Sequence, residues 1–422
     1  MIFDYDTLKV IWWALIGVLL IAFAVTDGFD MGVLILLPFI GRTDTERRVI
    51  INTIGATWEG NQTWLITAAG ATFAAWPLVY AVSFSGMYMA MLLVLFALFF
   101  RPVGFDYRNK LANPLWRSAW DWGLFTGGAV PSFVFGVAFG NLLLGVPYHF
   151  DDTMRSFYTG SFWMLLNPFA LLAGVVSVAM LVLHGSTFLQ IRTIGVVNAR
   201  AVRATIISAA LLIVAFALAG WMVTGLTGYR ITQMPPPGVN ALPLAKTVVA
   251  VPGGWLANYD TYPWMKLAPI AVFAGALLAA VLARLGWAKL AFICSGTAVT
   301  AVILTAAFSM FPFIVPSSSH PGSSLTAWDA VSSHLTLQIM FWVVLVFVPL
   351  IMLYTAWVYR VLRGKITAEF VEEESHVLYR TGCAKGKFHV VLHLDTGTRI
   401  GAGIRHHQCD VARGCVHVRR TR

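Results

Sequence analysis

FAVTDGFDMGVLILLPFI at residues 23–40 and TIGATWEGNQTWLITAAG at residues 53–70 are two mostly apolar stretches that carry acidic side chains. Asp27 and Asp30 lie in the first stretch, and Glu59 lies in the second. A charged side chain at the centre of a bilayer costs from about 3 to more than 10 kcal/mol, so an acid there needs a partner, a proton or a function. We interpret the three acids as part of a proton path.

The composition around these stretches is that of a membrane protein. The 422-residue chain is 58% hydrophobic and only 11% charged, and its mean hydropathy is +0.75. Apolar runs recur from end to end, which a single globular core would not require. The first run is too long for a signal peptide and has no small-residue cleavage site after it. The sequence therefore predicts an all-α polytopic membrane protein that retains its first segment.

Nine segments contain the roughly 20 mostly apolar residues that a membrane-spanning helix needs. They are residues 10–40, 52–74, 77–100, 116–145, 159–190, 203–227, 263–284, 287–312 and 333–361. We expect residues 1–366 to form a transmembrane helical domain and residues 367–422 to form a disordered cytoplasmic tail.

Basic residues indicate the orientation of these segments. The odd-numbered connections carry clusters such as Arg42, Arg47 and Arg48, whereas the even-numbered connections carry few Lys or Arg. The positive-inside rule then places the N-terminus outside and the C-terminus in the cytoplasm. An odd number of spans also requires the two ends of the domain to lie on opposite sides of the membrane.

This orientation gives the acids an order of depth. At 1.5 Å per residue, Asp30 lies about 15 Å, Asp27 about 20 Å and Glu59 about 10 Å from the cytoplasmic surface. Asp106 and Asp121 lie at or near that surface. The acids therefore form a ladder towards the middle of the membrane. The alternative is that each acid neutralises a neighbouring arginine or accepts backbone hydrogen bonds.

Polar and aromatic side chains surround Glu59 within one and a half helical turns: Trp58, Asn61, Gln62 and Trp64. Asn and Gln side chains donate and accept at once, so they can hold a carboxyl group or a water molecule in place. Equally, such residues commonly form hydrogen bonds between membrane helices without any further role.

Histidines test whether the chain binds haem, because membrane haem proteins usually supply His or Met ligands from inside the bundle. Only His184 and His334 fall in or at the predicted spans, and neither has a second ligand at matching depth. His184 is expected to be a hydrogen-bonded core residue and His334 to lie near the outer interface. We expect the chain to ligate no haem or metal.

Several motifs in order resemble subunit II of bacterial cytochrome bd ubiquinol oxidase, over residues 1 to about 379. They are VTDGFDMG at 25–32, GRTDTERR at 41–48, WEGNQTWL at 58–65, AAWPLVY at 74–80, FRPVGFDYR at 100–108, GVAFGNLL at 136–143 and MFPF at 310–313. The resemblance implies a heterodimer in the inner membrane with a haem-bearing subunit I, often joined by a very small single-span subunit. The enzyme oxidises ubiquinol and reduces oxygen to water with protons taken from the cytoplasm. Haems b and d belong to subunit I, and some members bind a structural ubiquinone in subunit II.

The same resemblance assigns roles to residues of this chain. It places the proton route on Glu59 and Asp30 with Trp58 beside them, and Glu59 stands where some members have Asp. Trp64 matches the residue at the mouth of a hydrophobic oxygen path. Asp27, Arg101 and Asp106 match the motifs without an equally defined role.

The last 43 residues depart from the family pattern. Residues 380–422 contain nine Lys or Arg and two acids, so +7 of the net charge of +10 lies there. A basic cytoplasmic tail can contact anionic lipid. Cys383, Cys409 and Cys415 with nearby histidines are types that bind zinc, but their spacing fits no standard site. We expect a disordered extension, and an altered reading frame is a further explanation.

A second functional class remains open, that of a proton-coupled secondary transporter. Such a protein would show inverted repeats and two matched broken helices, and we find no convincing repeat between the halves. No nucleotide-binding loop or hydrolase motif occurs, and no nucleic-acid partner is expected; the expected partners are subunit I, ubiquinol and lipid.

Overall fold

The structure is a computed structural model, and it describes residues 3–234, 236, 238 and 242–373. Long helices make up most of this part, and three two-stranded antiparallel hairpins lie in the connections. The helices are α1 Tyr5–Ile40, α2 Asp44–Ile54, α3 Trp58–Ala75, α4 Pro77–Gly86, α5 Tyr88–Leu98, α6 Phe100–Tyr107, α7 Pro114–Leu144, α8 Pro168–Arg192, α9 Gly195–Gly225, α10 Ala257–Thr261, α11 Leu267–Arg284, α12 Ala288–Met310, α13 His334–Val361 and α14 Ala368–Glu373. The strands are β1 Tyr148–Phe150, β2 Ser156–Tyr158, β3 Thr227–Gln233, β4 Thr247–Pro252, β5 Phe313–Val315 and β6 Leu325–Thr326.

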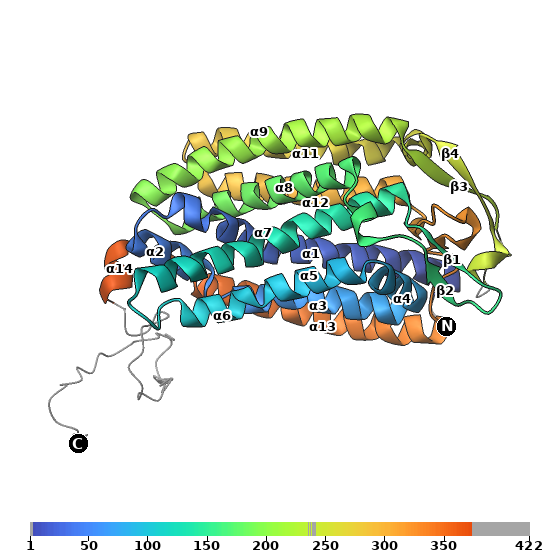
Figure 1. Cartoon of the computed structure of the whole chain (residues 1–422), viewed down its shortest axis with the longest axis horizontal. Coiled ribbons are helices and arrows are strands. Elements are labelled where there is room, and N and C mark those ends of the chain that lie inside the picture. Colours follow the sequence, from blue (N-terminus) through green and yellow to red (C-terminus); the bar gives the residue numbers. More distant parts are fainter. Residues whose placement is uncertain (1–2, 235, 237, 239–241, 374–422) are drawn as a thin grey trace, which may run out of the picture. The chain divides into compact units, whose positions relative to one another are not determined.

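Helix α1 lies at the centre of the bundle, packed against α3, α7 and α8 (Figure 1). Glycines allow the close approach of α1 to α8, because a Cβ atom at Gly185 would lie only 2.6 Å from the backbone carbon of Gly32. Small residues commonly permit such contacts between membrane helices. This crossing fixes the part of α1 that carries Asp27 and Asp30.

Within the described residues, eight helical segments are long and apolar enough to cross a membrane, one of them being the stretch Tyr88–Tyr107 that contains α5 and α6. They correspond to eight of the nine predicted spans. The exception is the predicted span 52–74. Helix α2 ends at Ile54 and α3 begins only at Trp58, and the first turn of α3 carries Glu59, Asn61 and Gln62. These polar side chains make α3 too polar to satisfy the same criterion. The predicted span 77–100 is also divided, into α4, α5 and the start of α6.

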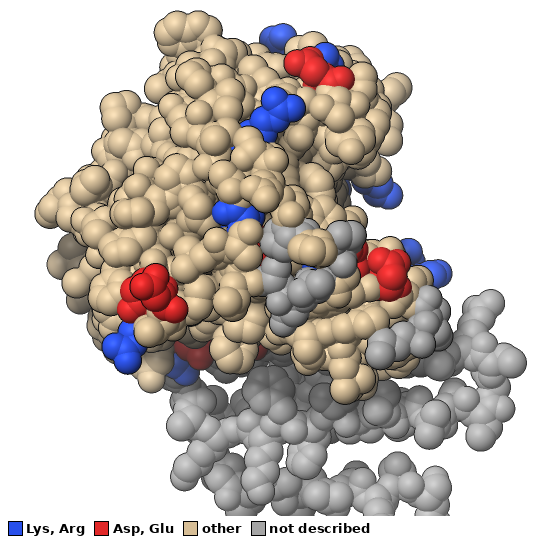
Figure 2. All heavy atoms as spheres, turned by 90° about the vertical axis from the view of Figure 1, so that its right-hand side faces the viewer, with Lys and Arg blue, Asp and Glu red and all other residues tan. Residues whose placement is uncertain are grey.

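Two ends of the bundle differ in character. The α2 end contains α2 and α14, whereas the hairpin end contains the six short strands (Figure 1). Seen from the hairpin end, charged side chains form small separate groups on a surface made mostly of other residues (Figure 2). The predicted tail boundary at residue 366 is followed by the short helix α14, which packs on α2. The rest of the predicted tail, residues 374–422, lies outside the described residues.

The hairpin end is held together by side chains from separate loops. The Lys246 ammonium lies 2.7 Å from the Asp329 carboxylate, and the side chains of both residues are almost fully buried. Burial lowers the pKa of Lys246, while its partner raises it again; burial also raises the pKa of Asp329, against the effect of the Lys246 charge. The Trp255 indole N–H donates to the Leu143 carbonyl at 2.7 Å. The loops of this end are therefore fixed to one another and to α7.

Candidate functional site

A buried ion pair joins α1 to α6. Arg101 donates from Nη1 to Oδ2 of Asp27 at 2.8 Å and from Nη2 to Oδ1 at 2.5 Å, and neither side chain is exposed. A bidentate pair of this kind is the strongest geometry available to arginine and a carboxylate. Asp27 thus has its own positive partner inside the bundle.

An aromatic pair covers this ion pair. The Arg101 guanidinium lies 5.4 Å from the centre of the Trp58 ring, and Trp58 stacks on Phe105 with ring centres 5.0 Å apart. A guanidinium over a tryptophan face is stabilised by the ring quadrupole. Trp58 therefore shields the Asp27–Arg101 pair and fixes α3 against α6.

Asp30 lies one helical turn beyond Asp27 and is likewise fully buried. Its Oδ2 accepts a hydrogen bond of 2.7 Å from Nδ2 of Asn61, whose Oδ1 in turn accepts one of 2.7 Å from the Tyr359 hydroxyl. Among the described residues, Oδ1 of Asp30 has no hydrogen-bond partner and no basic side chain forms an ion pair with Asp30. Asp30 is thus the carboxyl group of this cluster whose charge is not matched by a dedicated partner.

The structure brings Asp27, Asp30 and Trp58 together, but Glu59 does not join them. Glu59 is exposed on the first turn of α3, on a face that no described part of the chain covers. The expected depth of about 10 Å for Glu59 requires a span that starts at residue 52. That start is wrong, because α3 begins only at Trp58. Asp106 near the end of α6 is also exposed.

Trp64 is buried on α3, in an apolar cluster with Phe23, Met31 and Met87. The position is that of an ordinary packed aromatic side chain. It is also continuous with the largely apolar interior of the bundle.

Asp121 belongs to a separate structural group at the α2 end. Its carboxylate accepts from Arg108 Nε at 2.5 Å and from Arg47 Nη1 at 2.8 Å. Arg108 also reaches Asp44 at 3.0 Å, which ties α2 to α6 and α7. For Asp121, the alternative that it neutralises neighbouring arginines describes the geometry found.

His184 is fully buried and bound by protein groups on both ring nitrogens. Nε2 lies 3.0 Å from the Val25 carbonyl and Nδ1 lies 2.8 Å from Oγ of Ser295. Because a carbonyl only accepts, Nε2 carries the proton and Nδ1 accepts from the serine. Nε2 of His334 lies 3.0 Å from the Phe3 carbonyl. Within the described ranges, no group of three or more His, Cys, Asp or Glu is placed to hold a metal ion, and the cysteine-containing tail lies outside those ranges.

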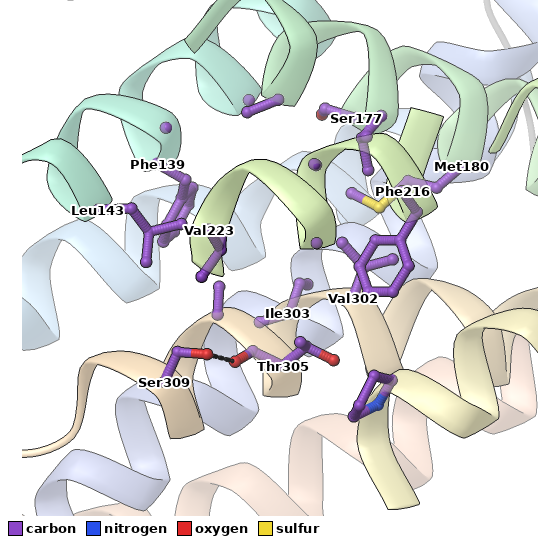
Figure 3. A pocket seen from close by; sticks show the side chains of 18 of the residues that line it. Phe139, Leu143, Ser177, Met180, Phe216, Val223, Val302, Ile303, Thr305 and Ser309 are labelled. Carbon is purple, nitrogen blue, oxygen red and sulfur yellow. Dashed lines mark hydrogen bonds between the residues drawn. The ribbon is translucent and has the colours of Figure 1, made fainter. Parts of the chain in front are cut away.

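A cavity of about 800 Å³ opens between α1, α7, α8, α9, α11 and α12. Figure 3 shows Phe139 and Leu143 of α7, Phe216 and Val223 of α9 and Ile303 of α12 around it. Ser309, whose hydroxyl donates to the Thr305 carbonyl at 2.9 Å, lines one side. The cavity could not be predicted from the sequence, because its walls come from helices far apart in the chain, and their apolar residues resemble any packing surface.

Two other residues of the site, Arg101 and Tyr359, could be recognised only from the fold. Arg101 could be read as a flanking basic residue, and only the packing of α6 on the bundle places it beside Asp27, 74 positions earlier. Tyr359 is one of four hydroxyl-bearing residues in the mostly apolar helix α13. Nothing in its local sequence distinguishes it from an interfacial tyrosine.

The fold and the site define a class: a polytopic helical membrane protein that encloses an ion pair and a second acid between α1, α3 and α6. The chain matches the family model of cytochrome bd terminal oxidase subunit II over residues 8–362. It is 52% identical over 377 residues to the cytochrome bd-I ubiquinol oxidase subunit 2 of Escherichia coli K12, covering 89% of this chain and 100% of that relative. The cytochrome bd ubiquinol oxidase subunit 2 of Bacillus subtilis 168 is 32% identical over 361 residues, which are 85% of this chain and 96% of the relative.

A solved structure agrees at the level of the fold. The bd oxidase from Geobacillus thermodenitrificans contains a chain that superposes with a TM-score of 0.62 at 12% identity, covering 84% of this chain and 98% of that one. This protein therefore belongs to the cytochrome bd terminal oxidase subunit II family, and the resemblance predicted from its motifs is confirmed. It is a multi-pass membrane subunit of a terminal oxidase complex.

Proposed function

We propose that this chain is the subunit without haem of a bd-type oxidase in a bacterial inner membrane, and that it conducts protons from the cytoplasm towards the partner subunit. In this proposal the haem-bearing subunit I holds haems b and d, oxidises ubiquinol and reduces oxygen. The names of the relatives from Escherichia coli and Bacillus subtilis support ubiquinol as the reductant. A very small single-span subunit is a further proposed member of the complex.

The observation that carries the proton role is the contrast between Asp27 and Asp30. Asp27 is held in a buried bidentate ion pair with Arg101, so its charge is fixed. Asp30 is equally buried but is met by the neutral amide of Asn61. A buried carboxyl group without a counterion gains or loses a proton far more readily than one in an ion pair. We assign the exchanging proton to Asp30 and a fixed electrostatic role to Asp27.

Three of the remaining predicted residues fit the same proton route, whereas Trp64 fits a path for oxygen. Glu59 and Asp106 are exposed near the α2 end of the bundle, where water or a partner subunit can reach them. Trp58 packs over the guanidinium of Arg101 and keeps this partner of Asp27 in place. Trp64 contributes to an apolar region, which suits a small apolar molecule such as oxygen better than a proton.

The charges at the two ends of the bundle support one orientation in the membrane. Arg42, Arg47, Arg48, Arg108 and Arg117 lie in or beside α2 and at the α6–α7 connection. The positive-inside rule favours placing this end in the cytoplasm, with the hairpin end and the N-terminus outside.

The cavity is suited to a structural ubiquinone. Its walls are mainly aliphatic and aromatic, as an isoprenoid chain requires, and hydroxyl groups of Ser177, Tyr259 and Ser309 are at hand for polar atoms of a head group. Apolar walls with a few polar groups are typical of cofactor sites. When bound, such a quinone would fill the cavity and pack against its walls, and its ring could accept and store electrons.

The proposal is tested on the complex purified from native membranes through a tag on this chain. We expect a haem-bearing partner and an absorption spectrum with haems b and d. Asp30→Asn should retain that spectrum but slow ubiquinol-driven oxygen consumption by roughly tenfold or more, as loss of a proton-transfer group does. A preparation without haem would refute the oxidase assignment, and unchanged turnover in Asp30→Asn would remove Asp30 from the proton route.

A further inference from the structure

The hydrogen bonds around Asp30 extend to the last membrane helix. Tyr359 of α13 donates to Oδ1 of Asn61 on α3, and Asn61 donates from Nδ2 to Oδ2 of Asp30 on α1, with both distances 2.7 Å. Tyr359 is partly buried, and its ring forms a T-shaped pair with Phe29, which precedes Asp30. Three helices thus meet at one carboxyl group.

The direction of these bonds is determined by chemistry. An ionised carboxylate only accepts hydrogen bonds, so the NH₂ group of Asn61 must face Asp30 and its oxygen must face Tyr359. A tyrosine hydroxyl is a good donor to that oxygen. If the hydroxyl were absent, the amide could rotate by half a turn and its oxygen could accept a hydrogen bond from the protonated carboxyl group of Asp30, which would favour the protonated form.

An amide does not readily pass a proton along a chain, because it would have to lose an N–H proton to do so. Asn61 is therefore suited to orient Asp30 rather than to relay its proton. Its bond occupies Oδ2 and leaves Oδ1 as the oxygen without a partner among the described residues. The arrangement selects one oxygen of Asp30 for proton exchange.

We propose that Tyr359 is a positioning residue for Asp30: it locks the Asn61 amide so that its N–H group stabilises the ionised carboxylate and leaves Oδ1 to exchange protons. The inference deepens the proposed proton role and rests on it for its significance in turnover. It adds α13, the last candidate membrane span of the described residues, to the elements that set the proton affinity of the site.

The other charged and titratable groups around Asp30 come from four helices. Asp27 lies on the same helix, Arg101 comes from α6 and Tyr359 from α13. Arg101 is bound to Asp27 through both terminal nitrogens. His184 of α8 is bound to Val25 and Ser295 rather than to Asp30.

The test uses the purified complex and the infrared band of the protonated Asp30 carboxyl group, identified by its loss in Asp30→Asn. Removing one hydrogen bond to a charged group shifts its titration by about one pH unit. We expect Asn61→Leu to move the titration midpoint to higher pH by about that amount. Tyr359→Phe should move it in the same direction by roughly half a unit, and the oxygen-consumption profile should move with it.

Matched variants separate positioning from packing. Tyr354→Phe makes the same change on α13 at an exposed tyrosine and should leave the midpoint unchanged. The side chains introduced by Tyr359→Gln and Tyr359→Met are similar in size, but only glutamine keeps a hydrogen-bond donor. The titration midpoint of Asp30 should stay near the wild-type value in Tyr359→Gln and rise in Tyr359→Met. This pair also decides the question if Tyr359→Phe does not assemble.

Equal midpoints in the Gln and Met variants, or an unchanged midpoint in Tyr359→Phe, would overturn the positioning role. A different result would refute the proton-route proposal: oxygen consumption at the wild-type rate in Asp30→Asn. The infrared titration remains decisive for Tyr359 in that case, since it does not depend on turnover.

Discussion

Arg101 and Asp27 form a bidentate ion pair with no exposed surface, although one residue lies in α6 and the other in the middle of α1. The pair explains how one acid can be tolerated deep in an apolar bundle. It also isolates the neighbouring Asp30 as the acid without a counterion. The division of roles between the two carboxyl groups follows from this difference.

Arg101→Met should destabilise the complex strongly, because it leaves the Asp27 charge buried without a partner. Breaking a buried pair from one side costs about 3–5 kcal/mol, whereas replacing both members by apolar residues is often nearly neutral. Thermal unfolding of the purified complex should therefore show a large loss for Arg101→Met and a smaller one for Asp27→Leu/Arg101→Met.

Arg117→Met is the control for this experiment. It removes a partly exposed arginine that pairs with Asp44 at 2.7 Å. Exposed pairs contribute about 0–1 kcal/mol, so the melting temperature should hardly change. Equal losses of melting temperature in Arg101→Met and Arg117→Met would show that the buried pair contributes no more to stability than the exposed one.

Glu59→Gln should slow oxygen consumption while leaving the haem spectrum largely intact. Because Glu59 is exposed in this chain, we expect a loss of only several-fold, smaller than that of a buried proton-transfer group. Oxygen uptake with ubiquinol at saturating concentration provides the measurement. Unchanged uptake would exclude Glu59 from the route, and loss of haem would indicate a role in assembly.

The sequence could predict the acids but not their partners. Asp27 and Asp30 stand out because charges are rare in an apolar run, and the end of the predicted first span at residue 40 agrees with α1. Arg101 and Tyr359 could not be assigned, since their contacts join helices far apart in the chain. The predicted start of the second span is wrong because the apolar residues at the end of α2, a separate helix that ends at Ile54, resemble the beginning of a membrane helix.

Gly220→Leu should reduce the quinone that copurifies with the complex. Gly220 lines the cavity, and a Cβ atom there would meet nothing within 4 Å, so the larger side chain can be accommodated without disturbing the helix packing. Extraction and mass spectrometry would measure the quinone bound per complex. Gly225→Leu is the control, since this residue of α9 also has open space at its Cβ atom but does not line the cavity. Equal quinone content in both variants would argue against this cavity as the site.

Asp329→Asn should weaken the hairpin end in a manner that depends on pH. The variant leaves the Lys246 ammonium buried at the Pro243 carbonyl, 2.8 Å away, without its counterion. Burial already lowers the pKa of Lys246, and loss of Asp329 removes the charge that raises it. A lysine whose pKa is lower in the folded state opposes folding when it is protonated, so the cost grows as the pH falls below the unfolded value of about 10.4. The melting temperature of the variant should therefore fall further below that of the wild type at pH 7 than at pH 9.5.

Asp260→Asn, which breaks the exposed pair with Lys266 at the same end, should show no such dependence. A deficit in Asp329→Asn that is the same at both pH values would mean that Lys246 is neutral in the folded wild-type protein as well.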